Sequence, residues 1–134
     1  ISRGALGNDT PESDLIVSPN HKILVSNDKT ALYFEESEVL VAAKHLTGLP
    51  GVQVMDGVDT IYIHLLFDHH EVILSNGTWS ESFQPGLQSL AGIGSAQRRE
   101  LLEIFPELAT YEGVENYVSA RRSIKAHEAT LLVK

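Results

Sequence analysis

Short runs of alternating apolar and polar residues occupy most of the first 83 positions of the chain, a pattern typical of half-buried β-strands. The runs are separated by Gly, Pro, Asn and Asp, which favour turns. We predict about seven short strands, drawn from the runs at 14–17, 22–25, 31–34, 39–41, 52–55, 58–67, 71–74 and 78–80.

Two dipeptides predict tight turns between these runs. Asp56-Gly57 and Asn76-Gly77 each lie between two apolar runs. Both pairs supply the positive φ angles that a type I′ turn requires. The sequence therefore predicts two β-hairpins, one around each dipeptide.

Helical spacing replaces the alternation in the last third of the chain. Residues 95–105 carry apolar side chains at helical spacing, with Ser95 as a suitable N-cap and Pro106 as the stop. A second helix is predicted over residues 116–132, where charges flank a narrower apolar face.

These elements predict a mainly β fold with a helical C-terminal extension. The β body covers about residues 14–83 and the extension about residues 84–134. The extension is too small to fold as an independent unit, so we expect one domain over residues 1–134.

Composition and charge exclude several classes of protein. The formal net charge is −8 and the ten Lys and Arg residues are scattered, which argues against a nucleic-acid partner. No apolar run is long enough to cross a bilayer, so we expect no membrane partner. The chain has no Cys, which excludes disulfides and thiolate metal sites within it.

Two stretches carry candidate groups for proton transfer. His21 ends a Ser-Pro turn between two predicted strands, and His70 precedes another strand after a similar break. Imidazole is the usual group for proton transfer near neutral pH. Ser18, His21 and Asp68 are also candidates for a hydrolase triad. The chain has no G-x-S-x-G elbow and no α/β pattern to support such a triad.

A metal site is a further alternative. His64, Asp68 and His69 offer imidazole and carboxylate ligands for a zinc-type site. No second group with a recognised ligand spacing accompanies them.

Four segments give the chain a family resemblance. They are DLIVSPNHKILV at 14–25, EVLVAAKHL at 38–46, YIHLLFDHHEVI at 62–73 and NGTWSESFQPG at 76–86. In this order they resemble a bacterial branch of the Hint (hedgehog/intein) superfamily, and the resemblance covers about residues 5–132. It implies an intein-like β-fold and self-processing chemistry.

The resemblance implies roles for four residues. In the family the first residue, usually Cys, attacks the preceding carbonyl and converts the amide to a thioester. A Thr-x-x-His motif holds this peptide, and its His protonates the leaving nitrogen. The run SPNH matches this motif, with Ser18 in place of Thr and His21 as the His. Asp68 and His70 fall in a second, assisting motif.

The chain also departs from the intein pattern. Asn76-Gly77 matches the Asn-Gly of the second motif, but Ser82 stands where an intein ends in Asn, and Glu81 stands where its His would be. Asn cyclisation needs that terminal Asn. We therefore expect cleavage before the first residue rather than splicing.

The nucleophile of the first motif is not recognisable in the chain. Only 13 residues precede Asp14, and none is Cys. We expect a partial Hint fold whose missing N-terminal strands lie on an upstream segment of the same protein, so that this chain alone is inert. The resulting exposed strand edges favour pairing with that segment or a homodimer.

Three further expectations complete this prediction. No cofactor is implied, and family analogy suggests a secreted bacterial protein. The alternative function is a catalytically degenerate Hint-fold domain for binding or assembly, with a His-based metal-binding module as the less favoured choice.

Overall fold

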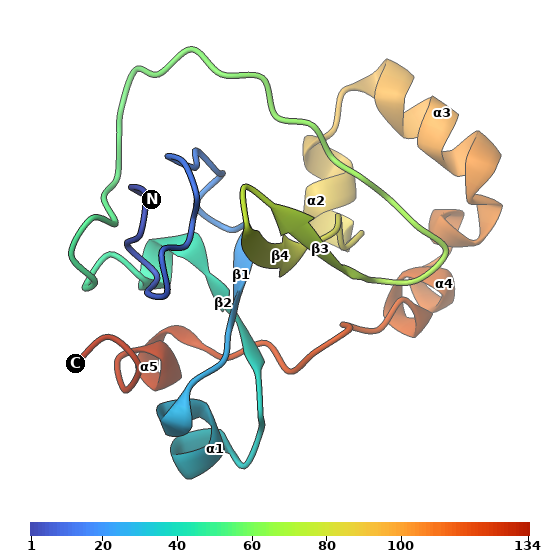
Figure 1. The fold of residues 1–134 in the computed structure, drawn as a ribbon. Coiled ribbons are helices and arrows are strands. Elements are labelled where there is room, and N and C mark those ends of the chain that lie inside the picture. The colour runs from blue at the N-terminus through green and yellow to red at the C-terminus, as the bar shows by residue number, and fades with distance from the viewer.

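A four-stranded antiparallel sheet forms the centre of the protein. The structure is a computed structural model that describes all 134 residues. Its strands are β1 (Lys22–Val25), β2 (Val39–Ala42), β3 (Val72–Ser75) and β4 (Thr78–Glu81). Their order across the sheet is β2-β1-β4-β3, so β1 and β4 bring together segments far apart in the sequence (Figure 1).

The β3–β4 hairpin confirms the second predicted turn. Ser75 pairs with Thr78, which leaves Asn76 and Gly77 as a two-residue loop. Their φ angles are 50° and 72°, the positive values that a type I′ turn needs. The predicted strands at 71–74 and 78–80 are therefore confirmed within one or two residues.

The β1–β2 pair is connected by a helix instead of a predicted strand. Residues 31–34 lie in helix α1 (Asp28–Phe34), so the strand predicted there is wrong. The side-chain oxygen of Asn27 accepts hydrogen bonds from the backbone amides of Lys29 at 2.9 Å and Thr30 at 3.2 Å. This N-cap satisfies free amides of the first turn and starts a helix where the turn chemistry favoured a reversal.

The hairpin predicted around Asp56-Gly57 does not form. Residues 52–55 and 58–67 contain no strand, and neither do residues 14–17. The chain from Val52 to His70 instead runs as a long connection around the sheet (Figure 1). Ile61 and Ile63 are 89% and 81% exposed. Their apolar pattern predicted burial, but no neighbouring strand covers them.

Short helices follow the sheet in the sequence. They are α2 (Leu87–Gly92), α3 (Ser95–Ile104), η2 (Pro106–Ala109), α4 (Tyr111–Asn116) and α5 (Ala126–Ala129), and η1 (Ala43–His45) follows β2 earlier in the chain. Helix α3 confirms the predicted helix and its stop, although Gly94 rather than Ser95 is its N-cap.

The helix predicted over residues 116–132 is wrong in most of its length. Helix α4 ends at Asn116, and α5 begins only at Ala126. Between them the chain forms no helix, and residues 122–124 lie beside β2. The amide of Leu40 donates to the Arg122 carbonyl at 2.8 Å, and the amide of Ile124 donates to the Leu40 carbonyl at 3.0 Å. Pairing with the sheet replaces helical hydrogen bonds here.

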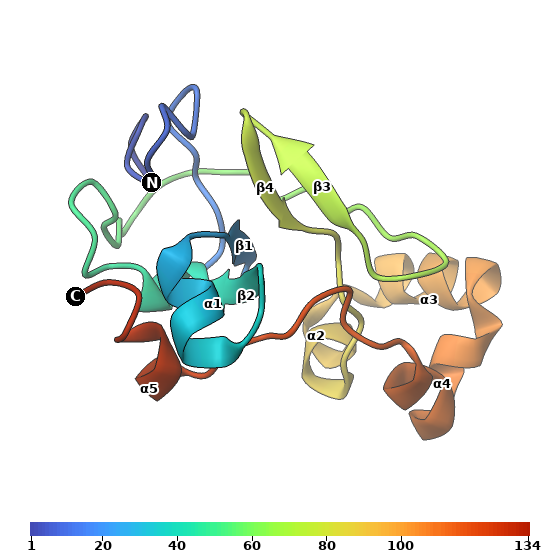
Figure 2. The ribbon, with the colours of Figure 1, turned by 60° about the horizontal axis from the view of Figure 1, so that its bottom comes forward.

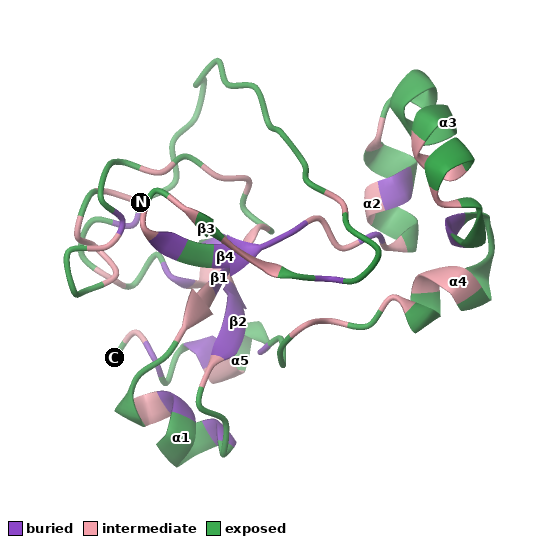
Figure 3. Ribbon diagram, turned by 45° about the vertical axis from the view of Figure 1, so that its right-hand side comes forward, coloured by how far each residue is buried: buried purple, intermediate pink, exposed green.

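The hydrophobic core lies between the β1–β2 side of the sheet and the chain end. Buried side chains from β1, β2, α1, the segment after η1 and the last residues form one cluster: Ile23, Phe34, Val39, Val41, Leu46, Val52, Ile124, Ala129 and Leu132. Helices α1 and α5 lie on this side (Figure 2). Most residues of β2 and β4 are buried and β1 is mostly half-buried, whereas α3 is largely exposed (Figure 3).

The fold is therefore mixed α/β rather than mainly β, with a four-stranded antiparallel sheet and several, mostly C-terminal, helices. The outer edge of β2 is covered by residues 122–124, while β3 has no strand on its outer side. Self-association through an open edge stays a prediction. None of the helices combines the length and apolar character needed to span a bilayer.

Candidate functional site

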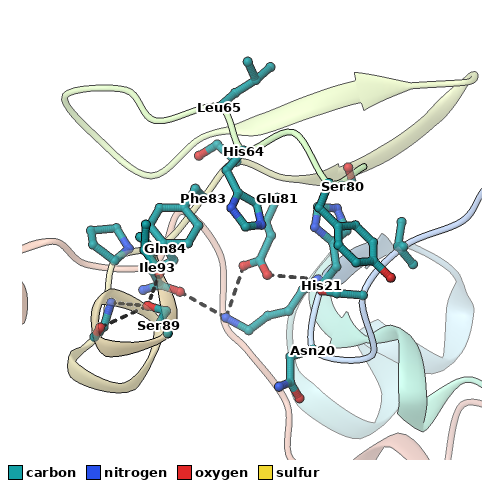
Figure 4. A pocket seen from close by; sticks show the side chains of 18 of the residues that line it. Asn20, His21, His64, Leu65, Ser80, Glu81, Phe83, Gln84, Ser89 and Ile93 are labelled. Carbon is teal, nitrogen blue, oxygen red and sulfur yellow. Dashed lines mark hydrogen bonds and ion pairs between the residues drawn. The ribbon is translucent and has the colours of Figure 1, made fainter. Parts of the chain in front are cut away.

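A cavity of about 1620 Å³ lies beside the junction of β1 and β4. Its walls come from the extended segments 15–18 and 61–65, from both strands and from the helices after β4. Its polar and titratable lining residues include Ser18, His21, Lys22, His64, Glu81 and Gln84. Figure 4 shows His21, His64, Glu81 and Gln84 around this space.

Glu81 is the most connected side chain of the cavity. It ends β4 and is only 7% exposed. Its Oε1 accepts a hydrogen bond from the backbone amide of Lys22 at 2.9 Å, and its Oε2 lies 3.2 Å from Lys22 Nζ. Burial alone would raise the pKa of Glu81, but the contacts with His70 and Lys22 hold this pKa below the usual range. The carboxylate is therefore ionised at neutral pH.

His70 lies behind Glu81, out of contact with solvent. Its side chain is 0% exposed, and its Nε2 lies 3.2 Å from Glu81 Oε2, at angles that miss those of a directed hydrogen bond. On the other side of the ring, Nδ1 accepts a hydrogen bond from the backbone amide of Ala120 at 2.8 Å. Because Nδ1 is an acceptor, the proton of the neutral ring sits on Nε2, toward Glu81.

His21 reaches the cavity from the turn before β1. Its amide donates to the Ser18 carbonyl at 3.0 Å, and its own carbonyl accepts from the Ala43 amide at 2.9 Å, which fixes the backbone on both sides. Burial lowers the pKa of His21; Glu81 raises it, and His64 and Lys22 lower it further, with a net decrease. His21 is therefore a neutral imidazole at pH 7, able to accept a proton.

Comparison with protein-family models gives a match to the Hint domain over residues 1–87. The chain belongs to the Hint domain family. The match covers well over half of the chain and includes Ser18, His21, His70 and Glu81. Searches of curated proteins and of solved structures found no significant match.

This Hint domain brings some of the predicted site residues together and separates others. Ser18 and His21 line the large cavity, whereas Asp68 is exposed and lines a second cavity of about 490 Å³ with His69 and His70. The hydrolase triad of Ser18, His21 and Asp68 is therefore not assembled. His70 contacts the large cavity only through Glu81.

The alternative metal site is not assembled either. No three His, Asp or Glu side chains lie where they could hold one metal ion. His64 instead packs its ring against Phe83, with the ring centroids 4.8 Å apart. Asp68 and His69 line the other cavity.

Sequence reasoning missed the roles of Glu81, Lys22 and Gln84. Glu81 was noted only as a residue at the position of an intein His. The sequence did offer a signal, because Glu81 comes at the end of a predicted strand whose neighbours are expected to be buried. An acidic group at such a place needs a charged or hydrogen-bonding partner. Its partner Lys22 lies 59 positions away, so its identity depends on the β1–β4 pairing.

The pKa of His21 tests this electrostatic arrangement. Glu81→Gln should lower the pKa of His21 further, and His64→Gln should raise it, because these neighbours act in opposite directions. The pH dependence of the His21 ring signals in NMR spectra measures both shifts, with His21→Gln used for assignment. A His21 pKa above the usual histidine value, or shifts of the same sign in both variants, would contradict it.

The same shift predicts the sign of a stability change. A histidine with a lowered pKa binds fewer protons in the folded than in the unfolded state. The contribution of His21 to the free energy of unfolding is therefore fully present above the pKa of the unfolded state. This contribution is lost as the pH falls from that pKa through the lowered pKa of folded His21.

Proposed function

We propose that this Hint domain is a self-processing domain that cleaves the peptide bond before a nucleophilic residue on an upstream segment of the same protein. The observation that best supports this function is that Ser18 and His21, from one turn, both line the large cavity next to the ionised Glu81. A neutral imidazole and a hydroxyl-bearing residue that line one cavity suit proton transfer in acyl chemistry.

The proposed reaction is an acyl shift followed by release. The upstream thiol or hydroxyl attacks the carbonyl carbon of the preceding residue while His21 takes its proton. The carbon–nitrogen bond then breaks, and His21 returns the proton to the leaving amine. This forms a thioester or ester. Water or an added nucleophile attacks that ester, releases the upstream acyl group and regenerates the thiol or hydroxyl.

The surroundings of Ser82 support cleavage without splicing. Ser82 occupies the position at which the intein pattern ends in Asn. Its side chain is 1% exposed, and its hydroxyl oxygen accepts a hydrogen bond from the Glu71 amide at 2.9 Å. A serine has no side-chain amide that can cyclise, so release of a C-terminal part by that route is not available.

Cleavage in the natural polypeptide tests the proposal. The protein is expressed from its gene together with the upstream residues, and hydroxylamine is added to trap the ester. We expect cleavage before a Cys, Ser or Thr upstream of the domain, with a hydroxamate on the released part. His21→Ala should slow the reaction at least about 100-fold, because it removes the general acid–base group.

The matched control is His127→Ala, because His127 is exposed on α5 and lies outside the cavity. This variant should cleave at the rate of the unaltered protein. Mass spectrometry of both fragments locates the broken bond. An unaltered protein that stays intact, or a His21→Ala variant that cleaves at full rate, would contradict the proposal.

A second candidate is a binding or assembly domain without chemistry. The exposed apolar segment 58–67 favours it, because most of its backbone groups are unpaired and such a chain can accept a strand from another polypeptide. This candidate predicts that the protein with its upstream residues stays intact in hydroxylamine while those residues protect segment 58–67 from proteolysis.

A further inference from the structure

Lys22 presents a fixed positive charge to the cavity that contains His21. Its Nζ lies 3.2 Å from Glu81 Oε2 and donates a hydrogen bond to Gln84 Oε1 at 3.0 Å. Its side chain is 24% exposed, and the residue lines the large cavity. In Figure 4, dashed lines end on the labelled partners Glu81 and Gln84.

Buried groups behind Glu81 hold this ammonium in place. The carboxylate contacts the fully buried His70 ring at 3.2 Å, and that ring accepts the Ala120 amide at 2.8 Å. The backbone amide of Lys22 binds the same carboxylate at 2.9 Å. Charge and geometry are therefore fixed before any ligand enters, the condition under which a charge stabilises a transition state most effectively.

The ammonium also retains a donor for a ligand. A lysine side chain has three N–H donors and no acceptor. Gln84 Oε1 accepts one of them, and Glu81 Oε2 is an ion-pair partner 3.2 Å from Nζ, without the geometry of a hydrogen bond. At least one N–H remains on a group that lines the cavity.

We propose that Lys22 stabilises the oxyanion that forms on the carbonyl of the peptide bond being cleaved, with Glu81 and Gln84 as its positioning residues. The inference rests on the proposed function, because an acyl shift passes through a tetrahedral intermediate whose oxygen carries a full negative charge. Lys22 donates to that oxygen while His21, the preceding residue, moves the proton. Lys22 also lowers the pKa of His21, which is consistent with both groups acting on one space.

The alternative is that Lys22 only neutralises the buried carboxylate of Glu81. The two roles differ in a double variant. Lys22→Met leaves Glu81 without its cation, whereas Lys22→Met combined with Glu81→Gln removes both charges. If Lys22 has only a structural role, the double variant should cleave at the rate of Glu81→Gln alone. If Lys22 stabilises the oxyanion, the double variant should cleave much more slowly than Glu81→Gln.

The test measures hydroxylamine-trapped cleavage in the natural polypeptide with its upstream residues. We expect Lys22→Met and the double variant to be slower by about 100-fold or more, and Lys22→Arg to recover part of the rate. Lys44→Met is the control, because Lys44 is exposed on η1 and lies outside the cavity. Should Lys22→Met not fold, the double variant and Lys22→Arg still decide the question.

The outcomes separate this inference from the proposed function. Cleavage of the double variant at the rate of Glu81→Gln overturns the role of Lys22 and leaves self-processing in place. No cleavage in the unaltered protein overturns both. A second readout needs no cleavage: in the 134-residue chain, the Lys22 ammonium should give a slowly exchanging ¹H–¹⁵N signal that the exposed Lys44 lacks. Its absence overturns the fixed position.

Discussion

Removal of residues 121–134 is expected to abolish the cooperative unfolding transition of the chain. This segment supplies Ile124, Ala129 and Leu132 to the core, with exposed fractions of 6%, 0% and 6%. Burial of each of the two larger side chains contributes about 1.5–3 kcal/mol. Their combined loss, together with the two backbone hydrogen bonds to Leu40, is a large part of a typical total stability of about 5–15 kcal/mol.

Urea unfolding followed by circular dichroism measures this effect. A point-variant pair separates packing from chain length: Leu132→Ser should destabilise the protein strongly, whereas Leu131→Ser should not, because Leu131 is 38% exposed and outside the core cluster. A truncated chain with the same unfolding free energy would show that the core does not depend on this segment. The family match ends at residue 87, so core formation extends beyond it.

Leu46→Ala should lower the free energy of unfolding by about 2–5 kcal/mol. Leu46 follows η1, is 0% exposed and belongs to the core cluster. The truncation removes apolar burial and leaves a cavity that the close-packed surroundings can fill only in part.

Leu32→Ala is the matched control for this variant. It makes the same change on α1, where the side chain is 73% exposed. We expect its effect to stay within about 0.5 kcal/mol. Equal losses in the two variants, measured by chemical denaturation, would contradict the assignment of the core.

Local signals in the sequence predicted the elements that depend on local chemistry. The Asn76-Gly77 turn, the strands on both sides of it and the stop of α3 at Pro106 were all predictable, because each follows from a few adjacent residues. Helix α1 was not predicted, because the same Asn and Asp that favour a turn also cap a helix.

The errors concern elements whose structure depends on distant partners. The apolar pattern of residues 58–67 predicted a strand, but a strand needs a neighbour, and none lies beside this segment. The non-helical path of residues 117–125 was missed for the opposite reason, because pairing of residues 122–124 with Leu40 overrides weak helical spacing.

The candidate site shows the same division. Ser18 and His21 were predicted from one motif of four residues, and both line the cavity. The connection of His70 to the cavity through Glu81, and the partnership of Glu81 with Lys22, depend on the pairing of β1 with β4. No local pattern contains that information.

The single point of pairing between β1 and β4 also affects the order in which the parts of the fold form. Ile23 lies opposite Ser80, and the strand pairs β1–β2 and β3–β4 each form between segments closer in sequence. Closing the longer loop costs entropy before its contacts can compensate, so docking of the two pairs is a late step of folding. Until it occurs, His21 and Lys22 are separated from Glu81 and His70. Under the proposed self-processing function, an upstream polypeptide attached to this domain would stay uncut during synthesis, and its release would report that folding is complete.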